Sequence, residues 1–139
     1  TIYQTFWDDD VRRGFLHSHS YTGNPLACRA ALATLDIFDT DHTLENNRQL
    51  STVITNALQP LANHTAVRHF RNTGMIWAMD VETSLADFSR RYFAAAMARG
   101  VLVRPIGNTV YLMPPYVLSE TDAQWLAEQM LDALNATLA

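Results

Sequence analysis

The hydrophobic positions of this chain first follow a helical period and then change to the pattern of strands. An alanine-rich stretch runs from Pro25 to about Asp39, and a second stretch, from about His42 to Leu58, places its apolar residues on one helical face. After it, short apolar runs occupy Val67 to Val81, which is typical of strands. The pattern therefore predicts two helices followed by a pair of strands.

Turn and capping residues mark the ends of these elements. Asn24 is a good N-cap, and Pro25 stands at the first helical position, where its missing N–H costs nothing. Val67 to Asn72 and Met75 to Val81 flank Thr73-Gly74, which predicts an antiparallel hairpin.

Capping signals also predict two further helices. Ser84 with Asp87 resembles a capping box that opens a third helix, and Gly100 closes it. Ser119 with Asp122 caps a last helix. An i, i+4 stripe of apolar residues along that helix predicts its buried face, and it consists of Leu126, Met130, Leu134 and Leu138.

Two more strands are expected between these helices. Val101 to Arg104 and Thr109 to Met113 lie on either side of Gly107-Asn108, an arrangement that favours a second hairpin. The order is then helix, helix, strand, strand, helix, strand, strand, helix. This order predicts an α+β fold, a small antiparallel sheet with helices packed on one face.

Composition narrows the class of protein. The 139 residues are 48% hydrophobic and 17% charged, which indicates a globular chain, and the net charge of −4 argues against a nucleic-acid partner. No apolar run approaches the roughly 20 residues that span a bilayer. A single cysteine, Cys28, and no visible signal peptide favour a cytoplasmic location. All 10 basic residues are arginine, and there is no lysine.

Arg104 is the sharpest candidate for binding chemistry. It follows the apolar run Val101 to Val103 and precedes Pro105, so a stiff backbone would hold its guanidinium, which can bind a carboxylate through two parallel hydrogen bonds. A salt-bridged surface arginine is an equally good interpretation of the same residues. Tyr111, on the expected partner strand, can face the same side, although a core position is the simpler interpretation of the pattern.

The segment before Asn24 offers a second set of polar groups. Ser18, Ser20 and Thr22 stand just ahead of a helix start, where hydroxyls and backbone N–H groups can hold a phosphate. An ordinary polar turn explains them as well. His17 and His19 would share one side of a strand, but a metal site needs a further ligand at a recognisable spacing.

Three segments together resemble the class III aminotransferases, which depend on pyridoxal phosphate. The first runs from Phe15 to Cys28 and contains Gly23-Asn24-Pro25. The second is Gly74-Met75-Ile76-Trp77-Ala78, and the third joins Gly100 to Pro105 with Tyr111 to Tyr116. The resemblance covers essentially the whole chain, as the C-terminal third of such an enzyme. It implies the small C-terminal domain of a fold-type I pyridoxal-phosphate-dependent transferase.

The resemblance also implies roles for single residues. Ser20 matches the hydroxyl residue that contacts the cofactor phosphate across a homodimer. Arg104 matches the arginine that binds the carboxylate of the oxo-acid substrate, and Tyr111 a tyrosine of the same pocket. The Schiff-base lysine would lie outside this chain. Residues 1–23 would be the tail end of the large cofactor-binding domain, and residues 24–139 the small domain.

Within the class, the third segment is most similar to the branch that acts in biotin biosynthesis. This implies S-adenosylmethionine as amino donor and 8-amino-7-oxononanoate as acceptor. Because the chain has no lysine, we expect no activity from the chain alone, and because its histidines have no recognisable ligand spacing, we expect no metal. Two alternatives stay open. One is another class III enzyme that acts on an omega-amino acid, and the other is a non-catalytic dimerisation or binding module derived from the small domain.

Overall fold

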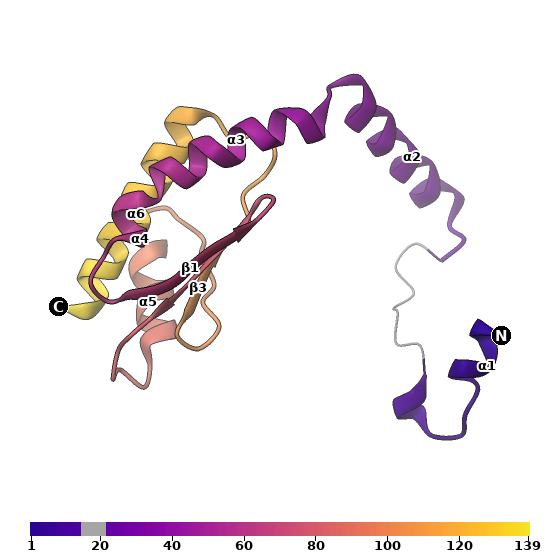
Figure 1. Ribbon diagram of the computed structural model, residues 1–139, viewed down its shortest axis with the longest axis horizontal. Coiled ribbons are helices and arrows are strands. Elements are labelled where there is room, and N and C mark those ends of the chain that lie inside the picture. Colours follow the sequence, from indigo (N-terminus) through magenta and orange to yellow (C-terminus); the bar gives the residue numbers. More distant parts are fainter. Residues whose placement is uncertain (15–21) are drawn as a thin grey trace. The chain divides into compact units, whose positions relative to one another are not determined.

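The computed structural model describes residues 1–14 and 22–139, and these divide into two compact units, Thr1–Asp39 and Thr40–Ala139 (Figure 1). The first unit contains helix α1, Ile2–Phe6, a 3₁₀ turn, Val11–Arg13, and nearly all of helix α2, Pro25–Thr40. The division of the chain between a large and a small domain, at residue 23, stays a prediction.

The start of α2 is the one that the sequence predicts. Asn24 Oδ1 accepts hydrogen bonds from the backbone N–H groups of Leu26, at 3.0 Å, and Ala27, at 3.3 Å. These are among the first N–H groups of the helix, which have no partner within it. The side chain of Asn24 therefore fixes where α2 begins.

The second unit holds the sheet and the remaining helices. Its elements are α3, Thr43–Ala57; α4, Gln59–Ala62; β1, Val67–Thr73; β2, Ile76–Val81; α5, Phe88–Met97; β3, Thr109–Leu112; and α6, Glu120–Leu138. This order confirms the α+β class that the hydrophobic pattern predicts. In the described part of the chain, no helix is both long and apolar enough to cross a bilayer.

The three strands form one antiparallel sheet in the order β1-β2-β3. The hairpin between β1 and β2 is confirmed, and its turn is Gly74-Met75, between the paired residues Thr73 and Ile76. Gly74 has φ +56°, in the left-handed region that glycine enters at little cost. Met75 belongs to this turn rather than to the strand.

One face of the sheet is buried under the helices. Trp77, Met79 and Val81 alternate with more exposed residues along β2, as expected for a strand with one face in the core. Helix α6 contacts α3, α4 and α5, so it is the common partner of the helical layer. The expected stripe on α6 is confirmed, since Met130 and Leu134 are fully buried and Leu126 and Leu138 pack against the core.

Two polar bridges connect the elements inside this core. Trp77 Nε1 donates a hydrogen bond to Thr55 Oγ1, at 2.9 Å, which joins β2 to α3. The Tyr92 hydroxyl donates to the carbonyl of Met130, at 3.1 Å, which joins α5 to α6. Burial raises the pKa of Tyr92, so the hydroxyl keeps its proton and stays a donor.

The capping predictions have different outcomes. Ser119 is the N-cap of α6, and its hydroxyl accepts from the N–H of Asp122, as predicted. The capping box at Ser84 is wrong, because α5 begins at Phe88 with Asp87 as N-cap. The Asp87 carboxylate binds the guanidinium groups of Arg90 and Arg91, at 2.9 and 2.8 Å, and makes no side-chain cap.

The strand predicted at Val101 to Arg104 is also wrong. Val101 and Val103 are buried and their neighbours are exposed, which is the alternation of a strand, but the segment has no ladder. Only Ile106 pairs with Thr109, as an isolated bridge. Pro105 has no N–H to donate, and the N–H of Val101 is taken by Ala96. These two constraints keep the segment out of the sheet.

A cluster around Asp80 links all three strands on the outer face of the sheet. Thr109 Oγ1 donates to Asp80 Oδ1, at 2.8 Å. Arg71 Nη1 lies 3.2 Å and His69 Nδ1 3.1 Å from Asp80 Oδ2. The Thr109 hydrogen bond, followed by those of Arg71 and His69, holds the pKa of Asp80 below its usual value.

This cluster predicts a pH dependence. Because the folded pKa of Asp80 is lowered, its contribution to stability is present above the ordinary carboxyl pKa, near 3.9, and is lost as pH falls through the folded pKa. Thr109→Val should raise the pKa of Asp80 toward that ordinary value, as measured by NMR titration of the carboxyl carbon. Thr52→Val is the control, since the Thr52 hydroxyl donates to the Arg48 carbonyl instead. An unchanged Asp80 pKa in Thr109→Val would contradict the assignment.

Candidate functional site

The segment that carries Arg104 is anchored at both ends by specific contacts. At its start, Gly100 has φ +78°, and the N–H of Val101 bonds to the carbonyl of Ala96, at 3.0 Å, at the end of α5. At its end, the Ser89 hydroxyl donates to the carbonyl of Pro105, at 3.1 Å. Val101 and Val103 point into the core. Leu102, which lies between them, and Arg104, which follows Val103, are therefore exposed.

Tyr111 reaches the same region from β3. It pairs with Ala78 of β2, and its strand neighbours Val110 and Leu112 are buried in the core. Side chains alternate across a strand, so Tyr111 projects away from the core and is half-buried. The prediction that Tyr111 faces the side of Arg104 is consistent with this geometry, and the simpler core interpretation is not.

Arg104 and Tyr111 line one cavity of about 390 Å³. Its walls come from the segment after α5, from β3 and the residues that follow it, and from α6. Apart from Arg104, every residue that lines it is uncharged, and most are apolar. Besides Arg104 and Tyr111, the lining comprises Gly100, Val101, Leu102, Val103, Leu112, Met113, Pro114, Pro115, Leu118, Trp125 and Leu126.

Arg104 is available for an external anion. In the described part of the chain, its guanidinium has no carboxylate within 4.0 Å, whereas seven other arginines form such ion pairs: Arg12, Arg13, Arg29, Arg68, Arg71, Arg90 and Arg91. The interpretation of Arg104 as a salt-bridged arginine is therefore not supported within residues 1–14 and 22–139. One free guanidinium in an apolar cavity suits a ligand with a carboxylate and an apolar body.

Trp125 differs from the tryptophan of the core. Trp77 is fully buried, whereas Trp125 is 45% exposed. It stands near the start of α6 and forms part of the cavity wall. A methyl group at Gly100 would lie 3.7 Å from its ring, so the indole packs over the glycine that precedes the arginine segment.

Ser20, His17 and His19 lie outside the described residues, so the phosphate loop and its role stay predictions. The other three histidines are described, and His42 Nδ1 lies 3.9 Å from Glu45 Oε2. His64 Nδ1 accepts from the N–H of Ala66, and His69 belongs to the Asp80 cluster. Among residues 1–14 and 22–139, no group of three or more histidine, cysteine or acidic residues is placed to hold a metal ion.

Comparison with known proteins decides the family. The family model described as aminotransferase class III matches residues 1–134. The chain belongs to the class III aminotransferases. These enzymes depend on pyridoxal phosphate, and the resemblance described from the three sequence segments is thereby confirmed at the level of the class.

Curated members of this class are similar along nearly the whole chain. The adenosylmethionine-8-amino-7-oxononanoate aminotransferase of Helicobacter pylori is 38% identical over 140 residues, which covers 96% of this chain and 32% of that protein. The enzyme of the same name from Synechococcus elongatus is 38% identical over 139 residues, again 96% and 32%. This chain therefore spans about a third of the length of these class III relatives.

A solved class III structure has the same fold. The crystal structure of adenosylmethionine-8-amino-7-oxononanoate aminotransferase from Methanocaldococcus jannaschii matches with a TM-score of 0.77 and 28% identity, over 97% of this chain and 33% of that one. The expected fold, that of a domain in a pyridoxal-phosphate-dependent transaminase, is thus confirmed.

The sequence did not indicate the apolar wall that comes from α6 and from Leu118 just before it. Leu118, Trp125 and Leu126 line the cavity, yet a stripe of apolar residues on a capped helix is equally typical of an ordinary core face. One signal was available: Trp125 is adjacent to Leu126 and therefore lies off the i, i+4 stripe that begins there. A large aromatic residue at the border of a buried stripe is a candidate wall of a site.

Gly100 offers a test of how the arginine segment is held. Gly100→Ala should lower the free energy of unfolding by about 1–2 kcal/mol, because a Cβ disfavours the left-handed conformation that this residue adopts. Chemical denaturation measures the change. Gly100→Asn is the matched variant and should lose less, since asparagine tolerates this conformation better. Equal stability of the alanine variant and the parent would show that the φ constraint is not needed.

Proposed function

We propose that this chain is the C-terminal part of an aminotransferase that transfers an amino group from S-adenosylmethionine to 8-amino-7-oxononanoate in biotin biosynthesis. The observation that carries the proposal is the single free guanidinium of Arg104 in an apolar cavity that Tyr111 also lines. Its support from comparison is that the similar class III proteins reported above carry this enzyme's name. We place the enzyme in the cytoplasm as a homodimer.

The proposed acceptor matches the cavity in its chemistry. The molecule 8-amino-7-oxononanoate has a carboxylate at one end, a ketone near the other, and a chain of methylene groups between them. Arg104 would bind the carboxylate by two parallel hydrogen bonds. The apolar walls, among them Leu102 and Met113, would shield the methylene chain from water.

Arg104 would therefore orient the oxo-acid substrate and take no part in making or breaking bonds. It would hold the carboxylate, which takes no part in the reaction, and so fix where the ketone lies. Tyr111 would restrict the position of the chain beside the arginine. Binding energy used far from the reacting atoms can raise the rate of reaction in this way.

The cofactor of the class is attached by residues that this chain does not have. Class III aminotransferases bind pyridoxal phosphate covalently through a lysine, and the sequence has none. The described residues therefore do not fit that attachment, and the part of this chain in catalysis is limited to substrate binding and to the phosphate contact that we propose for Ser20.

One prediction of the proposed function concerns Arg104 in the full-length enzyme. Arg104→Gln should raise the KM for the oxo acid by about 10- to 100-fold, the value of hydrogen bonds to a charged group. The half-reaction with the amino donor should be unchanged, because in this class the two substrates react in turn. Steady-state and single-turnover kinetics with each substrate separate the two effects.

Arg99→Gln is the matched control for this experiment. It removes the same charge, but the Arg99 guanidinium donates to the carbonyl of Ala95 and is not part of the cavity wall. If both variants raise the KM for the oxo acid equally, Arg104 has no special role. If the full-length enzyme accepts an omega-amino acid but not S-adenosylmethionine as donor, the correct function is that of a class III enzyme that acts on an omega-amino acid.

Another prediction of the proposed function concerns the chain by itself. The 139 residues should show no transaminase turnover with any donor, and mixing with pyridoxal phosphate should produce no absorbance of a lysine adduct, because no lysine is present. Turnover by the purified chain, verified by mass to be free of other proteins, would contradict the assignment to a part of a larger enzyme.

A further inference from the structure

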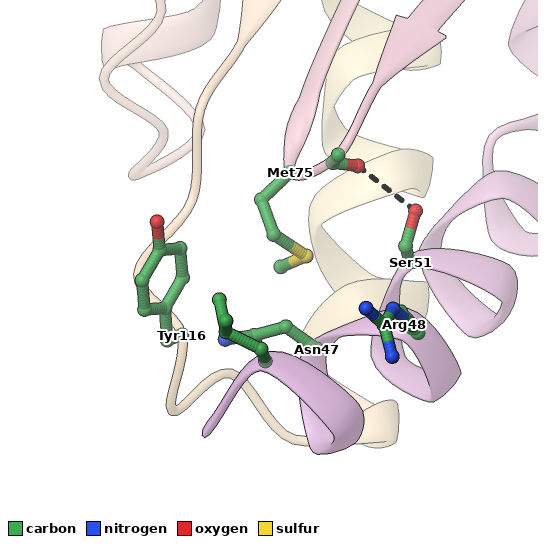
Figure 2. Close-up of a pocket in the computed structure, with 7 residues that line it drawn as sticks. Asn47, Arg48, Ser51, Met75 and Tyr116 are labelled. Atoms are coloured by element: carbon green, nitrogen blue, oxygen red, sulfur yellow. Dashed lines mark hydrogen bonds between the residues drawn. The ribbon is translucent and has the colours of Figure 1, made fainter. Parts of the chain in front are cut away.

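A second cavity, of about 350 Å³, lies between α3 and the β1–β2 turn (Figure 2). Leu44, Asn47 and Arg48 of α3 form one wall, Met75 of the turn forms another, and Tyr116 closes a third side. In the described part of the chain, no residue lines both this cavity and that of Arg104. The two are therefore separate sites.

The frame of this cavity is fixed by hydrogen bonds between α3 and the turn. Ser51 Oγ donates to the carbonyl of Gly74, at 2.9 Å, and Asn72 Nδ2 lies 3.4 Å from both of these oxygen atoms. Met75 is 7% exposed, so the turn is packed rather than free. A ligand would meet a preformed wall, which lowers the entropic cost of binding.

Asn47 is the first sign that something binds here. The residue is only 8% exposed, and its Oδ1 atom has no hydrogen-bond partner among the described residues. A buried acceptor without a partner costs about 1–3 kcal/mol, and asparagine is also a weaker helix former than leucine or alanine. An apolar residue would fill this position of α3 at lower cost.

Arg48 is the second sign, and it is independent of the first. In residues 1–14 and 22–139, its guanidinium has no carboxylate within 4.0 Å and no hydrogen bond to an acceptor. The other residues that line the cavity, Leu44, Met75 and Tyr116 among them, carry no negative charge. In Figure 2, Asn47 lies between Arg48 and Tyr116, below Met75. A positive charge and a polar amide thus lie side by side next to apolar side chains.

We propose that this cavity binds a small organic carboxylate that also carries an N–H donor and an apolar group. The guanidinium of Arg48 pairs with the carboxylate. The N–H bonds to Oδ1 of Asn47, which a rotation about the soft terminal torsion of the side chain turns toward the cavity. The apolar group contacts Met75 and Leu44. This chemistry is that of an N-acylated apolar amino acid, and the proposal does not depend on aminotransferase activity.

The test uses the 139-residue chain and N-acetyl-L-leucine as the probe. We expect saturable shifts of the backbone amide signals of residues 44–51 and 74–75 in NMR spectra, with a dissociation constant on the order of 1 mM for a ligand of this size. N-acetyl-L-leucinamide, which has no carboxylate, should bind at least about tenfold more weakly. Equal binding of the two probes would overturn the role of Arg48.

Three variants locate the site. Arg48→Gln should weaken binding of the probe at residues 44–51 and 74–75 by about tenfold or more, whereas Arg99→Gln, which removes the same charge from a residue that lines neither cavity, should leave this binding unchanged. Asn47→Leu should weaken binding and raise the melting temperature together, because it removes the unpartnered buried oxygen. Full binding at residues 44–51 and 74–75 by Arg48→Gln, or by Asn47→Leu, would overturn the proposal.

Discussion

The burial of Val101 and Val103 holds the candidate site in place. Both side chains belong to the hydrophobic core, and their burial, rather than a strand ladder, fixes the segment that carries Arg104. With two alternate residues fixed inward, the residues next to them must face outward. The direction of the arginine is thus a consequence of packing in the core that α6 shares with α3, α4 and α5.

The charge distribution of the chain supports the importance of two arginines. Arginine is the only basic side chain present, and it stays charged in every environment. Seven of the 10 have a carboxylate partner in the described structure, and Arg99 has a backbone carbonyl. Arg48 and Arg104 are left, and each lines a cavity. The two guanidinium groups without a partner in the described structure therefore lie where a ligand can reach them.

Much of the fold could be predicted because its signals are local. Asn24 and Ser119 mark helix starts by hydrogen bonds to nearby N–H groups, and Thr73-Gly74 marks a hairpin by its backbone freedom. The strand at Val101 to Arg104 could not be distinguished in this way, since alternate burial looks the same with or without a ladder. Pro105 was a signal against it, because a residue without an N–H weakens any ladder.

The site was predictable only in part, for a related reason. Arg104 and Tyr111 belong to neighbouring segments, so alternation alone brings them to one side. Trp125 has a local signal only in its place at the border of the α6 stripe, and Asn47 depends on contacts between elements that are distant in sequence, which no local pattern reports. The family resemblance contributed roles to Ser20, Arg104 and Tyr111 that the residues alone left open, and for these three residues the roles remain proposals.

The missing ladder has a consequence for how the Arg104 site moves. In the part of the chain that the structure describes, the amides of Leu102, Val103 and Arg104 have no backbone acceptor, while those of β2 are paired on both sides. Small backbone movements of this segment break few hydrogen bonds and leave the sheet intact, while the buried side chains of Val101 and Val103 keep it attached to the core. The wall of the cavity can therefore adjust to its ligand while the core beneath it stays rigid.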